Sequence, residues 1–342
     1  MRNPRTISAR LAIVGWLLAV AGCAHRPDRF AAEFNVEMAK HDARVVAIAQ
    51  SDRTKALVAG RESGEIEIWD TETGSLRHRL NAHKLRANNL SFSADGTKFF
   101  SNSYFDDSTK LWDTSTGELL QSIQGRGPSA AAPIPGYQLM EDGGSSSSLR
   151  IFDLTSRSFL ARKYEAGGGV TSLGADAATG LVAVGTASGT LRVWRMASQP
   201  AGPVLESVGE ATPYAMANWV IAVHFPPGGK SLYSVARSGA IDEWAVPSLR
   251  KIRSVAVPLA FFWTAAFSSK SAVAAVGGTF DRHGLETGGV AVIDLDTGKA
   301  DVHRITTNLP ALQYIGDGAM LLFTEHRGAK AVPTQRKSQP GS

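Results

Sequence analysis

One short segment of the sequence, residues 280–286, places side chains of different chemistry close together. Asp281 and Glu286 could act as general bases, and His283 could act as an acid or a base near neutral pH. Arg282 adds a cation that could hold an anionic group. Such a set would suit a hydrolase or lactonase acting at the mouth of a channel. The same charges could instead pair with one another at the solvated tip of a hairpin, and both interpretations stay open.

The other reactive side chains form no recognisable catalytic or metal-binding pattern. The eight histidines show no HxH or HExxH spacing, and a single cysteine cannot build a thiolate zinc site. No GxSxG elbow or P-loop is present. The run Gly167-Gly168-Gly169 lacks a following lysine to hold phosphate, so we interpret it as a connector. The sequence therefore predicts no enzyme, no metal and no cofactor.

The single cysteine, Cys23, follows a segment with the features of an export signal. Three arginines precede an apolar stretch at residues 11–21, which as a helix would be about 16 Å long and too short for a hydrocarbon core of about 30 Å. The small residues at 20–22 followed by Cys23 resemble the lipobox of bacterial lipoproteins. The resemblance implies that residues 1–22 are a signal peptide that is removed. It also implies that Cys23 carries two or three acyl chains, such as palmitate, which would anchor the protein stably.

The leader also bears on compartment, charge and partners. Removing its three arginines lowers the formal net charge from +5 to +2, which leaves no electrostatic argument for nucleic acid. Ala24 stands where many enteric lipoproteins that stay in the inner membrane have aspartate, which favours the outer membrane. We expect an exported protein of the bacterial cell envelope, anchored to the membrane by lipid and facing the periplasm. Residues 23–31 are expected to be a linker.

A unit of four short strands recurs through the rest of the chain, and its clearest copy spans residues 90–123. Alternating apolar residues around Leu90 suit a half-buried strand, and residues 94–96 suit a tight turn. Further strands are expected at 98–101, around 111–112 and at 118–123, with Gly117 in a turn that favours a positive φ. The four strands would form an antiparallel meander, which is one blade.

The third strand of this unit recurs six times, at intervals of 43, 40, 42, 50 and 49 residues. A blade of about 40 to 45 residues is typical of WD repeats, and loop insertions can account for the two longer intervals. The chain therefore resembles the WD-repeat family over residues 32–333, and this resemblance implies a β-propeller. The aligned third-strand residues are Trp69-Asp70, Trp112-Asp113, Phe152-Asp153, Trp194, Trp244 and Ile293-Asp294.

A seventh, incomplete unit predicts how the ring closes. Strands are expected at 311–315, 319–324 and 329–332, and the stretch 33–38 could add the fourth, removing two open sheet edges. The predicted fold is all-β: a seven-bladed propeller of four-stranded antiparallel blades, closed by an N-terminal strand that joins the last blade. Six or eight blades stay possible because the third unit is irregular. The polar residues 334–342 are expected to form a disordered tail.

Blade two carries the polar side chains that well-formed WD blades share. The resemblance implies a hydrogen-bonded set of His83, Asp106 and Trp112, with Ser101 or Ser103 as the hydroxyl. The implied role is structural, because a buried indole N–H needs an acceptor. Other blades have a serine–glycine pair where the aspartate would stand, so we expect them to depend on packing. These pairs are Ser63-Gly64, Ser188-Gly189 and Ser238-Gly239.

The loop face of the propeller is the expected binding surface, since the loops between blades and the loops between second and third strands converge there. Arginine and aromatic residues, which dominate protein-binding hot spots, gather at these positions. About half of the neighbouring aromatics, such as Phe262 or Trp263, are expected to point into a blade. The first strands are entered through Arg44, Arg86, a residue near Ser129, Gly169, Trp219, Phe261 and Asn308. The predicted partner-binding face comprises Arg44, Arg86, Tyr104, Phe105, Tyr214, Trp219, Phe261, Asp281, Arg282 and His283, with Met216 nearby.

Together these observations predict a membrane-anchored periplasmic scaffold that engages another envelope protein through its loop face. Fold analogy carries part of this prediction. Two alternatives stay open: a hydrolase or lactonase using residues 281–286, and a sensor that binds a small ligand in the central channel.

Overall fold

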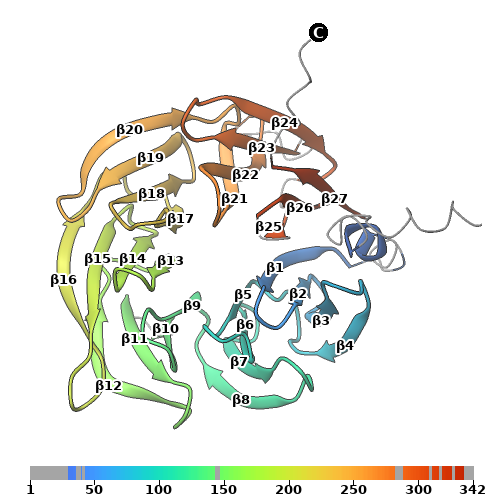
Figure 1. Cartoon of the computed structure of the whole chain (residues 1–342), viewed down its shortest axis with the longest axis horizontal. Coiled ribbons are helices and arrows are strands. Elements are labelled where there is room, and N and C mark those ends of the chain that lie inside the picture. The colour runs from blue at the N-terminus through green and yellow to red at the C-terminus, as the bar shows by residue number, and fades with distance from the viewer. Residues whose placement is uncertain are drawn as a thin grey trace, which may run out of the picture.

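The structure is a computed structural model that describes residues 30–35, 40, 43–142, 147–281, 288–307, 310–315, 318–325 and 328–334. Its strands form seven antiparallel sheets arranged around a central axis (Figure 1). The innermost strand of every sheet contacts the innermost strands of both neighbouring sheets, so the ring is closed. This confirms the predicted seven-bladed propeller.

Within each blade the strands follow one another from the axis outward. Six blades have four strands, and the seventh has three in the part of the chain that the structure describes. Blade one comprises β1 (Val45–Ser51), β2 (Ala56–Arg61), β3 (Glu65–Asp70) and β4 (Leu76–Asn81); blade two, β5 (Asn89–Phe92), β6 (Lys98–Ser103), β7 (Ser108–Asp113) and β8 (Leu119–Gln124); blade three, β9 (Ser129–Ala131), β10 (Tyr137–Glu141), β11 (Ser148–Asp153) and β12 (Ser158–Glu165); blade four, β13 (Val170–Asp176), β14 (Leu181–Thr186), β15 (Leu191–Ala197) and β16 (Val204–Ala211). Blade five comprises β17 (Val220–His224), β18 (Ser231–Ala236), β19 (Ala240–Ala245) and β20 (Arg250–Ala256); blade six, β21 (Phe261–Phe267), β22 (Val273–Thr279), β23 (Gly288–Asp294) and β24 (Ala300–Ile305); blade seven, β25 (Leu312–Ile315), β26 (Met320–Glu325) and β27 (Gly328–Pro333).

The position of a strand in its blade determines its sequence pattern. Second strands have neighbouring blades on both sides, and β2, β14 and β18 are buried along their whole length. Such strands need a continuous run of apolar and small residues. Outer strands have one solvated face, so β4 and β20 carry arginine and other polar residues at exposed or half-buried positions. Burial therefore decreases from the second strand of each blade to its outer strand. The repeat is visible in the sequence because this decrease recurs from blade to blade.

The ring closes through a helical segment, which corrects the prediction of an N-terminal closing strand at 33–38. Residues 30–35 are helical, and 36–39 lie outside the described residues. Phe30 and Phe34 are fully buried against Trp69 of blade one and Met320 of blade seven. The spacing explains the difference, because residues i and i+4 share one face of a helix and a strand would place Phe34 with alternate residues. Phe30 therefore belongs to the packed core, although it falls in the predicted linker.

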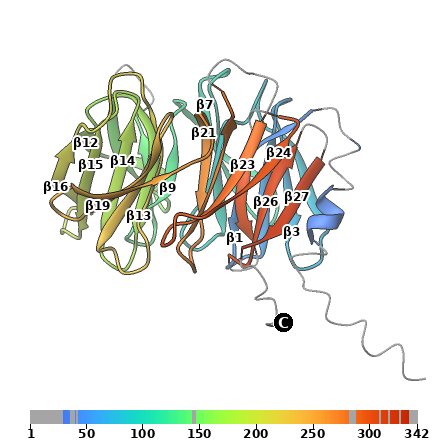
Figure 2. The same ribbon diagram turned by 90° about the horizontal axis from the view of Figure 1, so that it is seen from above.

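The helical segment lies at the outer edge of the seam between blades one and seven, beside β27 and β3 (Figure 2). Its two phenylalanine rings stack at 5.6 Å, and the Phe34 ring meets the Trp69 ring edge-on at 5.1 Å. Asn35 Oδ1 accepts a hydrogen bond from the Ala329 backbone N–H at 2.8 Å, which links the segment to β27. No helix in the described part of the chain is long and apolar enough to cross a membrane.

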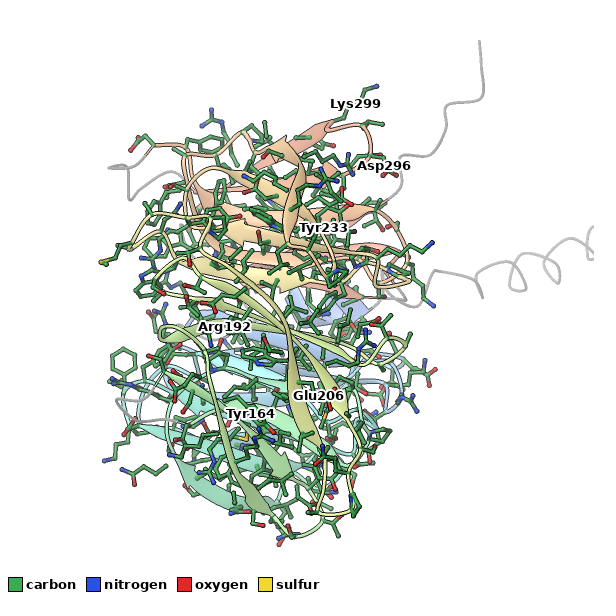
Figure 3. All side chains as sticks on the ribbon, turned by 90° about the vertical axis from the view of Figure 1, so that its left-hand side faces the viewer. Tyr164, Arg192, Glu206, Tyr233, Asp296 and Lys299 are labelled. Carbon is green, nitrogen blue, oxygen red and sulfur yellow. The ribbon has the colours of Figure 1, made fainter. Side chains whose placement is uncertain are left out.

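Side-chain hydrogen bonds join neighbouring blades at their rims as well. The Tyr164 hydroxyl on β12 accepts from the backbone N–H of Leu205 on β16 at 3.0 Å, and both residues are buried (Figure 3). Blade three, the irregular unit of the sequence, is thus held by blade four, and its first strand begins at Ser129 as expected.

Candidate partner-binding face

Blade two contains the complete polar set that the sequence predicted. The His83 ring lies between Asp106, 3.1 Å from Nδ1, and the Ser101 hydroxyl, 2.9 Å from Nε2. Trp112 donates its indole N–H to the same hydroxyl oxygen at 2.9 Å. Burial lowers the pKa of His83 although Asp106 opposes the shift, so the ring is neutral, donates to Asp106 and accepts from Ser101. Ser101 is therefore the serine of the set, and Ser103 donates to a loop carbonyl instead.

Blade five has an equivalent network that the sequence did not predict. Trp244 donates its indole N–H to Ser234 at 2.8 Å, as Trp112 does to Ser101. The position of the histidine is taken by Tyr214, whose hydroxyl lies 2.7 Å from Ser234 and donates to Asp242 at 2.7 Å. Asp242 stands on the third strand, not in the turn before it. The Tyr214 hydroxyl thus points into the blade and not out of the predicted partner-binding face.

In blade one, a buried ion pair provides the acceptor for the tryptophan indole N–H. The side chains of Arg61 and Glu67 have no exposed surface, and the guanidinium donates two hydrogen bonds of 3.1 Å to the carboxylate. Trp69 donates its indole N–H to Glu67 at 3.3 Å. The aromatic positions of blades three and four, Phe152 and Trp194, are buried as well.

The aspartates that follow the third-strand aromatics have a local role. Asp113 Oδ1 accepts the backbone N–H groups of Ser115 and Thr116, and thereby caps the turn into the outer strand. The hydroxyl of Ser115 adds a further hydrogen bond, and together these lower the pKa of Asp113. The same turn is capped by Asp70, Asp153 and Asp294.

The predicted arginine pair of the loop face is neutralised by a carboxylate. Arg44 makes a bidentate pair with Glu62, with distances of 2.9 and 3.1 Å. Arg86 lies 3.8 Å from the same carboxylate. Glu62 is in the loop between β2 and β3, so this acid comes from blade one itself. The two arginines therefore share one carboxylate, which compensates part of their positive charge.

Other predicted residues lie on the loop face but apart from one another along the ring. Tyr104 and Phe105, in the loop between β6 and β7, are 44% and 59% exposed. Asp281 is exposed in the loop that follows β22. Arg282, His283 and Glu286 lie outside the described residues, as do Cys23 and Asn308, so the structure places neither the mixed-charge segment nor the lipidation site.

The densest feature of the loop face joins blades five and six and is built around Arg237, which the sequence did not single out. Its guanidinium lies over three aromatic rings, 4.0 Å from the centroid of Trp219, 4.8 Å from Trp263 and 5.2 Å from Phe261. We call these four residues the Arg237 cluster. The prediction had included Trp219 and Phe261, and the arginine is what brings them together.

Backbone hydrogen bonds and a bulge position the Arg237 cluster. The Arg237 N–H donates to the Trp219 carbonyl at 2.8 Å, and the Phe262 N–H donates to the Arg237 carbonyl at 2.7 Å. The pairing of β21 with β22 shifts by one residue at Trp263. Such a bulge turns a side chain away from its regular position in the sheet. Phe262 is fully buried, while Trp263 and Phe261 meet at 4.9 Å with their rings tilted by 66°.

Two side-chain N–H groups of the Arg237 cluster lack partners among the described residues. Arg237 Nε and the indole N–H of Trp263 are both buried without a hydrogen-bond acceptor there. Within the described part of the chain, no carboxylate pairs with Arg237. Burial lowers the pKa of its guanidinium, which reflects the cost of taking the charge out of water. This face therefore offers a cation beside exposed aromatic surface, with two unpartnered N–H groups buried beneath it.

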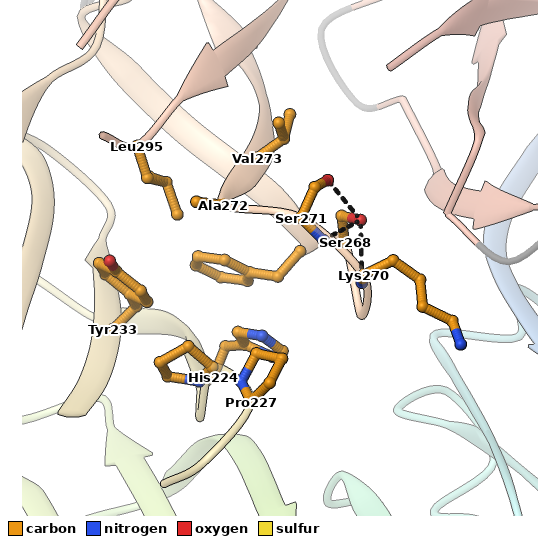
Figure 4. Close-up of a pocket in the computed structure, with 11 residues that line it drawn as sticks. His224, Pro227, Tyr233, Ser268, Lys270, Ser271, Ala272, Val273 and Leu295 are labelled. Carbon is orange, nitrogen blue, oxygen red and sulfur yellow. Dashed lines mark hydrogen bonds between the residues drawn. The ribbon is translucent and has the colours of Figure 1, made fainter. Parts of the chain in front are cut away.

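A separate pocket of about 130 Å³ lies between blades five and six on the face opposite the loop face (Figure 4). His224 stacks on Phe267 at 4.7 Å, with the rings nearly parallel, and Tyr233, its cross-strand neighbour, stacks on Phe267 at 6.0 Å. Burial lowers the pKa of His224 to about 4, so the imidazole is neutral near pH 7. Pro227 and Leu295 complete an apolar wall. No group of three or more acidic, histidine or cysteine side chains that could hold a metal occurs among the residues the structure describes.

Comparison with known proteins finds a recognised repeat at the best-formed blade. Residues 74–113 match the family model of the WD domain, G-beta repeat. The matched segment runs from the last strand of blade one to the third strand of blade two, and it contains His83, Ser101, Asp106 and Trp112. The chain thus carries a WD repeat within a seven-bladed propeller.

Part of the chain is similar to eukaryotic translation initiation factor 3 subunit I from several animals. The Bombyx mori protein is 27% identical over 119 residues, which is 34% of this chain and 35% of that protein. The Homo sapiens protein is 27% identical over 127 residues, 37% of this chain and 38% of that protein. The Culex quinquefasciatus protein is 29% identical over 105 residues, 30% and 32% of the two chains. The chain therefore spans about a third of the length of the curated relatives it matches.

Proposed function

We propose that this WD-repeat propeller is a non-enzymatic binding platform that engages a protein partner through its loop face. The observation that carries the proposal is the Arg237 cluster, because arginine and tryptophan dominate the energetics of protein interfaces. WD-repeat propellers are typically protein-interaction platforms, and the animal relatives are named as a subunit of a factor. The partner on this proposal is another protein of the bacterial cell envelope.

The second part of the proposal is that lipidated Cys23 anchors the propeller to a membrane, with the outer membrane favoured and the protein facing the periplasm. Phe30 lies beside Gly74 in the turn between β3 and β4, on the face opposite the loop face. Phe30 is seven Cα–Cα steps from Cys23, which can span at most about 25 Å. An anchored propeller would therefore keep that face near the membrane and direct the loop face away from it, toward a partner.

Crosslinking in intact cells, followed by identification of the attached proteins, tests the platform. We expect recovery of the partner to fall at least tenfold when Trp219 and Phe261 are both replaced by alanine. Tyr104 and Phe105 provide the control, because they are exposed aromatics of the same face in blade two and lie outside the Arg237 cluster. Undiminished recovery of every attached protein from the W219A/F261A variant would remove the cluster as the binding site.

Metabolic labelling with palmitate tests the anchor separately. We expect label to enter the protein and to be lost in the Cys23→Ser variant. Label that enters both forms equally, or neither, contradicts lipidation at Cys23.

A second candidate function, small-ligand sensing, is favoured by the pocket of His224 and Phe267 and not by the central channel. Its apolar, aromatic lining suits a flat ligand. A thermal-shift screen of envelope metabolites tests it, with Ala272→Phe as the variant that fills the pocket. Ligands that raise the melting temperature of the wild-type protein and not that of the filled variant support sensing. Equal shifts in both proteins, or no shift in either, oppose it.

A further inference from the structure

We propose that the Arg237 cluster binds a carboxylate carried by an extended peptide segment of the partner protein. This proposal rests on the platform function and specifies the chemistry of its site. The Arg237 guanidinium supplies the charge, and the surrounding aromatic surface receives the apolar residues next to the carboxylate.

The first argument is that Arg237 differs from four other arginines near the loop face. Arg44 and Arg86 share Glu62, Arg126 lies 3.8 Å from Asp107, and Arg192 lies 2.8 Å from Glu210. Each therefore has an acid supplied by the chain itself. The structure records no such acid for Arg237 among the described residues, although its side chain is partly buried. A half-buried cation without a counter-charge leaves room for one from a ligand.

The second argument is that the aromatic rings compensate only part of the guanidinium. A ring face attracts the positive charge. Ring faces do not replace an oxygen acceptor for the N–H groups, and Arg237 Nε and Trp263 Nε1 have no partner among the described residues. A buried donor left in this state is destabilising. No described residue supplies the cluster with an oxygen acceptor, which leaves that role to a partner.

The third argument concerns the kind of anion. A carboxylate carries one negative charge and matches the planar fork of one guanidinium, whereas phosphorylated ligands are usually bound by clusters of arginines. Arg237 provides a single unpaired guanidinium, so the charge complementarity favours a carboxylate.

The fourth argument concerns the carrier of the carboxylate. Met216, in the loop before β17, is 88% exposed, and Trp219 is 38% exposed. This open apolar surface extends along the loop on one side of Arg237. An extended peptide with an acidic residue flanked by apolar residues would cover both the cation and this surface.

The test selects peptides on the protein expressed from the full chain, with a displayed library of random twelve-residue peptides as the probe. We expect the selected peptides to contain an acidic residue, or a free C-terminal carboxylate, beside apolar residues. Synthetic copies should lose at least tenfold in affinity when the carboxylate is replaced by its amide. They should also lose at least tenfold against Arg237→Gln.

Two further variants distinguish three contributions to peptide affinity: the charge of Arg237, the planar shape of its guanidinium, and the positive charge of other arginines. Arg237→Lys keeps the charge but lacks the fork, so its affinity should fall between those of the wild type and R237Q. Arg192→Gln is the matched control, because this arginine is already paired, and it should bind like the wild type. Selected peptides that lack a carboxylate, or that bind R237Q within twofold of the wild type, would overturn the proposal.

Failure of this inference is distinguishable from failure of the platform function. If crosslinked partner is lost from the W219A/F261A variant and retained by R237Q, the platform stands and carboxylate recognition is wrong. If both variants retain the partner in full, the cluster is not the platform's binding site.

Discussion

Blades two and five satisfy the same buried tryptophan in two ways. In both, a serine hydroxyl on the second strand accepts the indole N–H, at 2.9 Å in blade two and 2.8 Å in blade five. Blade two supports this serine with His83 and takes its acid from the turn between the second and third strands. Blade five uses Tyr214 and takes its acid, Asp242, from the third strand. The shared element is the serine, and the groups behind it are interchangeable.

The position of the acid determines which interactions the turn between the second and third strands can make. In blade two the turn is committed to structure, because Asp106 holds His83 and accepts from the backbone N–H of Lys84. In blade five the corresponding turn contains no acid and begins with Arg237, followed by Ser238 and Gly239. A guanidinium beside a turn carboxylate would be neutralised. The relocation of the acid to Asp242 thus leaves Arg237 available to an external anion.

The largest expected difference between the two blades concerns their acids. Asp242 is buried and accepts hydrogen bonds from Tyr214, Lys251 and Ser254. Asp242→Ala should lower the free energy of unfolding by about 3 kcal/mol, since it leaves these donors without their acceptor. Asp106→Ala should cost about 1 to 2 kcal/mol, because its partner His83 is neutral whereas Asp242 also accepts from the Lys251 cation. Urea denaturation measures both, and a larger loss for Asp106→Ala would contradict the comparison.

The second difference is in acid sensitivity. Burial lowers the pKa of His224 in blade five to about 4, whereas a histidine in an unfolded chain titrates near 6.5. Between these values the unfolded chain holds one more proton than the folded protein. Stability is therefore full above pH 6.5 and falls by about 3 kcal/mol as the pH drops to 4. His224→Phe should keep the stack on Phe267 and remove this part of the decrease.

The measurement is the free energy of unfolding of wild type and His224→Phe at pH 7 and pH 4.5. Burial also lowers the pKa of His83, but Asp106 opposes that shift, so a smaller decrease is expected from blade two. If the His224→Phe variant loses as much stability on acidification as the wild type, the stacked histidine is not its source.

A smaller effect should follow from the tyrosine that replaces the histidine. Tyr214→Phe removes the hydroxyl that joins Ser234 to Asp242, and should cost about 1 to 2 kcal/mol. Because Tyr214 stands in the loop that leads to Trp219, hydrogen exchange should accelerate at residues 212–219. Tyr104→Phe is the matched control, because its hydroxyl bonds Asn89 of blade two; exchange at residues 212–219 should be unchanged in this variant. Unchanged exchange in Tyr214→Phe would show that the hydroxyl does not hold this loop.

The smallest effect is expected at Arg237 itself. Arg237→Gln should change the free energy of unfolding by no more than about 0.5 kcal/mol, because loss of the cation–π attraction is offset by removal of an unpaired donor. Thermal unfolding measures this. A loss of several kcal/mol would assign the arginine to the structure of blade five and not to binding.

The ring of seven blades could be predicted from the sequence because the blades repeat the same burial pattern. The third-strand aromatics Trp69, Trp112 and Trp244 are visible since blades one to five each bury an aromatic at the same place. Blade two's polar set was also predictable, because His83, Ser101 and Asp106 have the residue types that the WD family shares.

The rest depends on contacts between residues far apart in the chain. Tyr214 does not belong to the polar set of WD blades, and its partner Asp242 has moved by several positions, so no local pattern indicated the network. The prediction of the binding face rested mainly on the residues that enter the first strands of the blades, and Arg237 is not one of them. An arginine directly before Ser238-Gly239, in a turn without an acid, is the signal that would have indicated it. The spacing of Phe30 and Phe34 would likewise have indicated a helix.

The helical segment at residues 30–35 has a mechanical consequence. Phe34 packs into the seam between the first and last blades, and Asn35 holds β27, so both ends of the propeller meet at one place. Tension on the chain ahead of residue 30 would act first on this helical segment and only then on the blades. The two phenylalanine rings and the Asn35 hydrogen bond would carry this tension first, while the shared core of blades one and seven would still hold the ring closed.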